Sequence, residues 1–188
     1  MVEVLMAART DNSGVVEHDD VDRGAIIQEM DEAKATLRRL LYLADAPTLA
    51  RRSNGTRWTN EQLLFHMVFG CMVVQRLLVL VRVFSRLPDG VSRVFARSLN
   101  AAITPFNIIN YYRSCAAALV YNRHRMGAKM DRVIASLQRK LARESDDSLR
   151  RGVHFPTRWD PFFKDYMTLE DVYRYPGKHS DFHKRQQT

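Results

Sequence analysis

The chain has 188 residues, which is enough for one domain with a substantial core and too few to require two. Hydrophobic residues make up 46% of it and charged residues 27%, and two cysteines cannot build a disulfide framework, so we expect a globular protein of the reducing cytoplasm. The net charge of +8 comes from scattered arginines without a recognisable nucleic-acid motif, which disfavours a nucleic-acid or membrane-surface binder.

Residues 1–21 predict an acidic arm rather than a packed element. Turn-forming residues fill 11–14, and His18 has no apolar context, so we expect a mobile segment with an exposed histidine. The start of the chain lacks the basic region of a secretory signal, and we expect none. A single domain is predicted over residues 22–188.

Two helices with clear boundaries follow the arm. Apolar residues spaced by three and four predict an amphipathic helix over 26–44. Thr59 and Gln62 form a predicted capping box, so the next helix starts there and runs to about Arg86. This second helix is long and apolar enough to span a membrane, but charged residues within it would be costly in lipid. We therefore interpret it as a buried helix of the core.

The middle of the chain is predicted to be helical as well. We expect a short helix over 92–102, an interruption at 104–107, and a long helix over 111–143. His124 lies between two arginines in that long helix and is expected to be exposed.

The last part predicts a loop and a fourth long helix. Residues 152–161 are rich in proline and aromatic residues, which predicts a structured loop, and Thr168 is the expected N-cap of the last helix. Pro176 and Gly177 should kink or restart that helix. No strand is predicted, so the expected fold is all-α: a four-helix bundle with a short extra helix and a structured proline and aromatic loop.

Three histidines are the candidate metal ligands. His179 and His183 are four residues apart, so on a helix their side chains lie on the same face. His66 lies inside one of the most apolar segments. If the second and fourth long helices pack side by side, the three imidazoles can hold one divalent ion. The alternative is a hydrogen-bonded core histidine together with an unrelated surface pair.

Such a ligand set is typical of a catalytic site, because three protein ligands leave a position for water or substrate. Imidazole suits zinc, nickel, iron and copper, so the ligands do not select the metal. Gln186 shares the helix face of the pair, and Tyr175 shares it too if Pro176 leaves the helix in register. We expect both to support a ligand or contact the substrate. No cysteine, aspartate or glutamate is better placed for a competing cluster, and Cys71 and Cys115 are expected in the core.

Two stretches resemble the DinB/YfiT-like superfamily. The run from Arg57 to Met67 resembles its Trp-Ser/Thr-x-x-Glu/Gln-x-x-x-His stretch. Residues 167–172, followed by His179, His183 and Gln186 at that family's spacing, resemble its last helix. The resemblance implies a four-helix bundle with a nickel, zinc or iron site at His66, His179 and His183, and bundles of this family often pair as homodimers.

The resemblance also implies a class of reaction. Characterised members include thiol-dependent enzymes, among them mycothiol-dependent isomerases and S-transferases and bacillithiol transferases. Arginine outnumbers lysine by 23 to 6, which suggests a GC-rich genome and favours mycothiol as the thiol cosubstrate. The loop at 156–161 and the Pro176-Gly177 pair are not general features of the family, and we expect them to reshape the pocket mouth.

The predicted function is therefore that of a metal-dependent enzyme, either a thiol-dependent transferase or isomerase, or a hydrolase. The ion would act as a Lewis acid that activates a thiol or a water. The basic body of the protein would help to recruit an anionic small-molecule substrate. The alternative is a non-catalytic helical-bundle protein that presents its surface to a binding partner.

Overall fold

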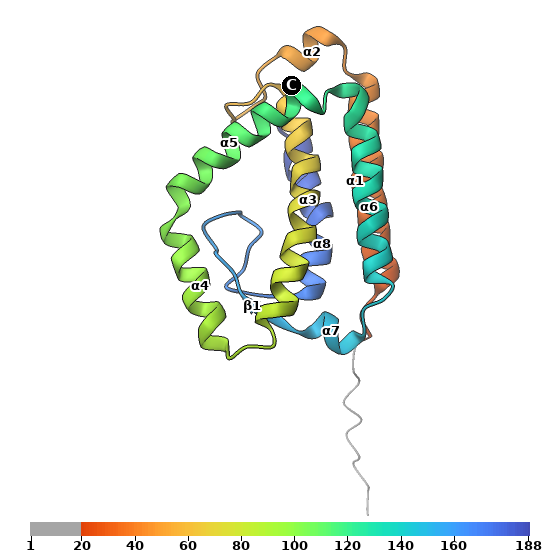
Figure 1. Ribbon diagram of the computed structural model, residues 1–188. Coiled ribbons are helices and arrows are strands. Elements are labelled where there is room, and N and C mark those ends of the chain that lie inside the picture. Colours follow the sequence, from red (N-terminus) through yellow and green to blue (C-terminus); the bar gives the residue numbers. More distant parts are fainter. Residues whose placement is uncertain (1–19) are drawn as a thin grey trace, which may run out of the picture.

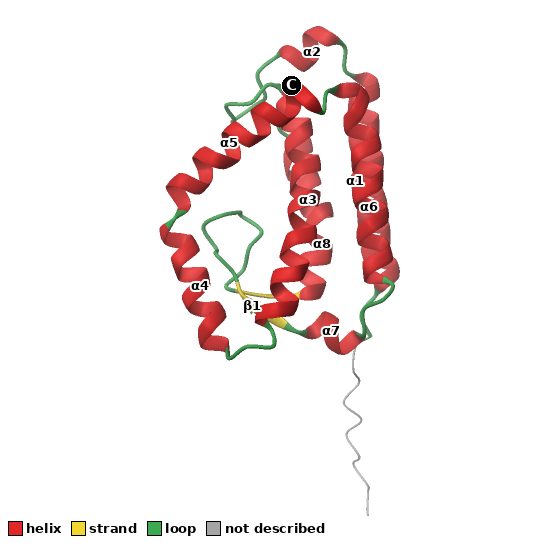
Figure 2. Ribbon diagram, in the orientation of Figure 1, coloured by secondary structure: helices red, strands yellow, loops and turns green. Residues whose placement is uncertain are grey.

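The computed structural model describes residues 20–188, and this part of the chain is all-α apart from one pair of short strands (Figures 1 and 2). The predicted arm, with His18, lies outside the described residues except for its last two positions. The elements in chain order are α1 (Arg23–Leu43), α2 (Ala46–Ala50), α3 (Asn60–Phe84), α4 (Asp89–Ala101), α5 (Ile103–Val120), α6 (Arg123–Leu141), α7 (Asp146–Arg150), β1 (Gly152–His154), β2 (Tyr166–Thr168) and α8 (Leu169–Lys184).

Four long helices form the core. α3 packs against α8 and α6, and α1 packs against the same two helices, so α8 has α1 on one side and α3 on the other (Figure 1). Their facing apolar side chains join into one continuous cluster. The pairing of α3 with α8 brings the candidate histidines onto neighbouring helices, since one lies on α3 and two lie on α8.

The start of α3 is fixed by the predicted capping box. The Thr59 hydroxyl accepts from the backbone N–H of Gln62, and the Gln62 side chain accepts from the backbone N–H of Thr59. This helix is long and apolar enough to cross a membrane, but more than half of its most apolar window is buried inside the protein. Its burial among α1, α6 and α8 places it in the core, as predicted from its charged residues.

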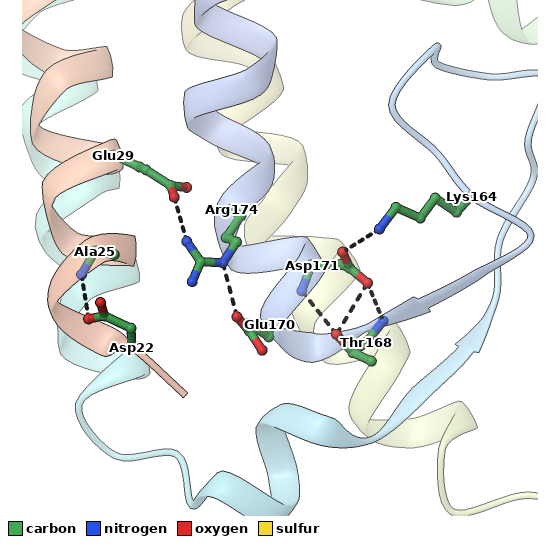
Figure 3. A network of polar contacts seen from close by, with 8 residues as sticks. All are labelled: Asp22, Ala25, Glu29, Lys164, Thr168, Glu170, Asp171 and Arg174. Atoms are coloured by element: carbon green, nitrogen blue, oxygen red, sulfur yellow. Dashed lines mark hydrogen bonds and ion pairs between the residues drawn. The ribbon is translucent and has the colours of Figure 1, made fainter. Parts of the chain in front are cut away.

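The start of α8 is held by a second capping box and by ion pairs (Figure 3). The Thr168 hydroxyl accepts from the Asp171 backbone N–H, and Asp171 also pairs with Lys164 at 3.1 Å. Arg174 bridges Glu170, one turn away on α8, and Glu29 on α1. These contacts fix the position of α8 along α1 before the helix reaches the histidines.

The prediction that Pro176 and Gly177 restart the last helix is wrong. α8 runs without interruption from Leu169 to Lys184 with Pro176 buried inside it. The proline removes one backbone donor, and packing on both sides of the helix compensates for that loss. A Cβ at Gly177 would lie 3.3 Å from the Cβ of Glu29, so the glycine lets α8 approach α1 closely.

The predicted helix over 111–143 is also wrong, because it is two helices. Tyr121 leaves the helical conformation, with φ −102° and ψ 68°, and the Asn122 side chain then caps α6 by accepting from the His124 backbone N–H. The expected interruption at 104–107 occurs slightly earlier, at Ala102 between α4 and α5. Pro105 lies in the first turn of α5, where a helix needs no backbone donor from it.

A small antiparallel sheet corrects the prediction that no strand forms. β1 and β2 each have three residues, too few to show an alternating pattern in the sequence. A side chain at Gly152 would lie 2.5 Å from the Met167 carbonyl oxygen, so the pairing requires glycine there. The strands close the base of the predicted proline and aromatic loop, which lies between the α4–α5 segment and α3 (Figure 2).

Candidate metal centre

His66 lies two turns into α3 and is only 7% exposed. Its Nδ1 atom is 3.2 Å from the hydroxyl of Ser114, a buried residue of α5. The indole of Trp58, just before the capping box, stacks on the imidazole with 4.3 Å between ring centroids. The ring is therefore held on one face and at one nitrogen, which leaves Nε2 free.

His179 is 2% exposed and belongs to a three-residue chain of hydrogen bonds. Its Nδ1 atom lies 2.9 Å from the Tyr175 hydroxyl, which donates to the Asp160 carboxylate at 2.5 Å. Because the tyrosine proton goes to Asp160, the phenolic oxygen accepts from Nδ1–H of the imidazole. The Nε2 atom of His179 is then an unprotonated acceptor, and it is buried without a hydrogen-bond partner.

His183 completes the group from the next turn of α8, with 8% of its surface exposed. Its Nδ1 atom is 2.6 Å from the side-chain oxygen of Gln186, which makes Nδ1 the protonated nitrogen. All three histidines thus use Nδ1 to bind a side-chain oxygen of the protein, as metal-ligating histidines usually do.

The three imidazoles converge in space. One nitrogen from each of His66, His179 and His183 lies within 4.8 Å of the other two. Three imidazole nitrogens this close together repel one another when each carries a lone pair, so the arrangement fits a cation. The orphaned Nε2 atom of His179 is the clearest sign of this fit. The alternative of an isolated core histidine and a surface pair is thereby excluded, because all three are buried together.

The pKa values also favour the neutral, ligating form of the histidines. Burial lowers the pKa of His66 well below 6.5, and the neighbouring His179 and His183 lower it further. Burial, followed by the charge of His179, lowers the pKa of His183 to about 4. Both imidazoles are therefore unprotonated near neutral pH without help from a bound ion.

Gly70 makes room for this cluster on α3. A Cβ at this position would overlap the ring atoms Cδ2 and Nε2 of His179. Glycine in the interior of a helix costs about 1 kcal/mol relative to alanine, so its presence here is explained by the close approach of α8.

The chain matches no family model, no curated protein and no solved structure. The chemistry of the site therefore rests on its own residues.

Asp160, like Ser114, is a residue of the site that was not predicted from the sequence. It lies in the proline and aromatic loop, accepts from the Tyr175 hydroxyl and the Phe162 backbone N–H, and comes within 3.7 Å of His179. Burial acts to raise its pKa, but hydrogen bonds with His179 and Tyr175 outweigh burial, and the pKa is lowered. In the sequence, only its position between a tryptophan and a proline distinguishes this aspartate from the others.

The two cysteines take no part in this cluster. Cys71 is buried in the core, and burial raises the pKa of its thiol to about 12, so it stays protonated and unreactive. Cys115 on α5 is half-buried rather than in the core as predicted. Both are free thiols.

A cavity of about 400 Å³ opens directly in front of the histidines. Its walls come from α3, α5, α8 and the loop between the strands, and all three imidazoles line it. A pocket of this size accommodates a small organic molecule. The candidate ligands therefore face a space that a small molecule can enter.

Proposed function

We propose that this protein is a metal-dependent enzyme in which His66, His179 and His183 hold one divalent ion. The observation that carries the proposal is the convergence of three buried imidazoles whose Nδ1 atoms are all occupied. The adjoining cavity supports a catalytic rather than a structural role, because a structural zinc site has four protein ligands. Zinc, nickel and iron all accept imidazole ligands, so each remains in the proposal.

The bound ion would supply Lewis acidity, which lowers the pKa of a thiol or water that reaches it. The protein residues supply position and environment. Tyr175 and Gln186 hold two ligands in one tautomer, Asp160 fixes Tyr175, and Trp58 covers the face of His66. The apolar cavity walls exclude water and strengthen every electrostatic interaction inside.

The reaction that we propose is transfer or isomerisation that uses a low-molecular-weight thiol, with hydrolysis as the other possibility for the same site. The sequence resemblance to the DinB/YfiT-like superfamily supports the thiol, with mycothiol favoured by the excess of arginine. The mutual packing of α1, α3, α6 and α8 supports the four-helix bundle that this resemblance implies. The proposal includes the cytoplasm as the compartment, where such thiols are kept reduced.

Metal analysis of single-histidine variants tests the site. His66→Ala, His179→Ala and His183→Ala should each lose the ion or bind it at least about a hundredfold more weakly, because two ligands remain. The measurement is metal content of the purified protein, followed by titration with zinc or nickel against a chromophoric chelator. His124→Ala is the matched control, since His124 is exposed on α6, and it should bind like the wild type.

A wild-type protein that takes up neither zinc, nickel nor iron would refute the metal site and leave the non-catalytic binding module as the function. If the ion binds, turnover of thiol and ester substrates with and without chelator separates the transferase from the hydrolase. Turnover that survives both the chelator and the His66→Ala change would contradict a role for the ion in the reaction.

A further inference from the structure

The cavity in front of the histidines has walls that are mostly aromatic. Phe106 of α5 and Trp159 of the loop stack with 3.7 Å between their ring centroids and an interplanar angle of 17°. Phe162 meets Phe182 of α8 edge-on at 5.7 Å. These rings line the cavity together with Phe69. Surfaces of this kind pack best on a planar, unsaturated ligand, because ring faces and edges attract one another.

The aromatic loop is held in place, so the cavity does not depend on a ligand to form its wall. The Trp159 indole donates to the Leu99 carbonyl oxygen at 2.7 Å, and the Arg158 backbone N–H donates to the Asn100 side chain at 3.0 Å. Both partners lie near the end of α4. The site is therefore largely preformed, which favours binding of a rigid ligand.

In the part of the chain that the structure describes, two charged side chains line the cavity, and only one of them is available to pair with a ligand. The carboxylate of Asp160 already accepts from Tyr175 and from the Phe162 backbone, so it faces the protein. Arg113 is exposed, and among the described residues that line the cavity it is the only one with a permanent positive charge. It forms no ion pair with any described residue, and its guanidinium carbon lies 5.6 Å from the centroid of the Phe69 ring.

Phe69 links the two polar ends of the cavity. Its ring centroid is 6.2 Å from that of His66, and the guanidinium of Arg113 lies over the same ring. An elongated molecule lying along Phe69 can therefore reach the histidines at one end and Arg113 at the other. The apolar wall between them excludes a ligand that is polar throughout.

We propose that the cavity binds a planar hydrophobic acid, with an aromatic ring system between Phe69 and the loop and an anionic group paired with Arg113. A second polar group at the opposite end of the molecule faces His66, His179 and His183. The part of this proposal that concerns the second polar group rests on the proposed function, because that group faces the proposed metal site. The binding of the ring system and of the anion rests on the cavity alone.

Two fluorescent probes with the same ring system test the proposal. 1-Anilinonaphthalene-8-sulfonate carries an anion, and N-phenyl-1-naphthylamine lacks it. With the full-length protein, both probes should bind with blue-shifted emission, and the sulfonate should bind more tightly. Arg113→Gln should weaken the sulfonate about threefold to fivefold, the effect of one exposed charge, and leave the neutral probe unchanged. Arg39→Gln, an exposed arginine on α1, is the matched control and should change neither probe.

Variants that fill the cavity locate the probes. Val73→Trp occupies the α3 wall and Ile109→Trp the exposed mouth on α5, and each should reduce binding of both probes at least about tenfold. Ile109 is exposed, so its variant folds even if the Val73 variant does not, and near-ultraviolet circular dichroism verifies both. If the Ile109→Trp protein and the Val73→Trp protein both fold and still bind the probes like the wild type, the probes bind elsewhere and the proposal is overturned.

Metal content measured on the same samples separates this inference from the proposed function. A protein that holds its ion but binds neither probe overturns the hydrophobic-acid ligand and leaves the metal site intact. A protein that binds both probes as described, yet takes up no ion, supports the cavity and refutes the enzyme. Equal effects of Arg113→Gln on both probes would overturn the assignment of the anion to Arg113.

Discussion

Each candidate ligand is held by an oxygen from a different source. Ser114 comes from α5, Tyr175 from the preceding turn of α8, and Gln186 from just beyond the end of that helix. Since each of these contacts uses Nδ1, three independent supports leave the Nε2 atom of each imidazole for an ion. Loss of one support should therefore disturb one ligand without dispersing the other two.

Replacing Gly70 with alanine should weaken metal binding although the change favours the helix. The new Cβ overlaps the ring of His179, so either this ring or α8 must move. We expect the affinity for zinc to fall at least about tenfold, since a misplaced ligand loses most of its bond to the ion. Competition with a chromophoric chelator measures the change.

Gly90→Ala is the control for this substitution. Gly90 lies in the first turn of α4, and a Cβ there meets no atom within 4 Å. The control should keep the metal affinity of the wild type. Equal affinities for both alanine variants would show that α8 adjusts freely and that Gly70 does not position His179.

The loop between the strands supports His179 through a chain of hydrogen bonds from Asp160 to Tyr175 to His179. Tyr175→Phe keeps the ring but removes the hydroxyl, which leaves Nδ1 of His179 without its acceptor. We expect metal affinity to fall about tenfold to a hundredfold, the usual effect of removing an outer partner of a ligand. The same chelator competition measures it.

Tyr173→Phe is the matched control, because Tyr173 is a buried tyrosine of the same helix. Its hydroxyl contacts Arg82 and Glu144 at 3.2 Å and no candidate ligand. This variant should lower the free energy of unfolding by about 1 kcal/mol and leave metal affinity unchanged. If the Tyr175→Phe protein binds zinc like the wild type, the loop does not position His179 for metal binding.

Helices with strong caps and apolar spacing were predictable from the sequence, and those without them were not. Thr59 and Thr168 mark the starts of α3 and α8 by local chemistry alone. The break at Tyr121 depends on how α5 and α6 pack, and helical periodicity continues across it. The uninterrupted α8 depends on its packing against α1 and α3, which overrides the local effect of Pro176.

The site shows the same division. The three histidines, with Tyr175 and Gln186, follow from their spacing and from the apolar setting of His66. Ser114 and Asp160 do not, because the first is 48 residues away from His66 and the second is 15 residues away from Tyr175. Contacts across that much chain depend on the course of α5 and of the loop, which no local pattern specifies.

The stability of the whole protein should depend on pH through the buried histidines. The pKa values of His66 and His183 are lower in the folded state than in the unfolded chain. Below about pH 6.5 the folded state therefore binds fewer protons than the unfolded chain does, and acid favours unfolding. The stability of the metal-free protein is therefore full above about pH 6.5 and is lost as pH falls towards 4. Urea unfolding with a chelator present should show a loss on the order of 1 kcal/mol from His183 alone between pH 6.5 and 5.

His183→Asn provides the comparison, since asparagine keeps polar contacts but does not titrate. Its stability should fall less steeply than that of the wild type over the same pH range. Identical pH dependence of the two proteins would mean that His183 is protonated in the folded state as readily as in the unfolded chain.

The position of α8 between α1 and α3 has a consequence for how the protein folds. Arg174 meets Glu29 across 145 residues of sequence, so the core is closed by contacts of long range rather than by neighbouring helices alone. Helical proteins fold fastest when their contacts are local, and closing long loops slows them. The three histidines therefore come together only when α8, from the end of the chain, packs between α1 and α3.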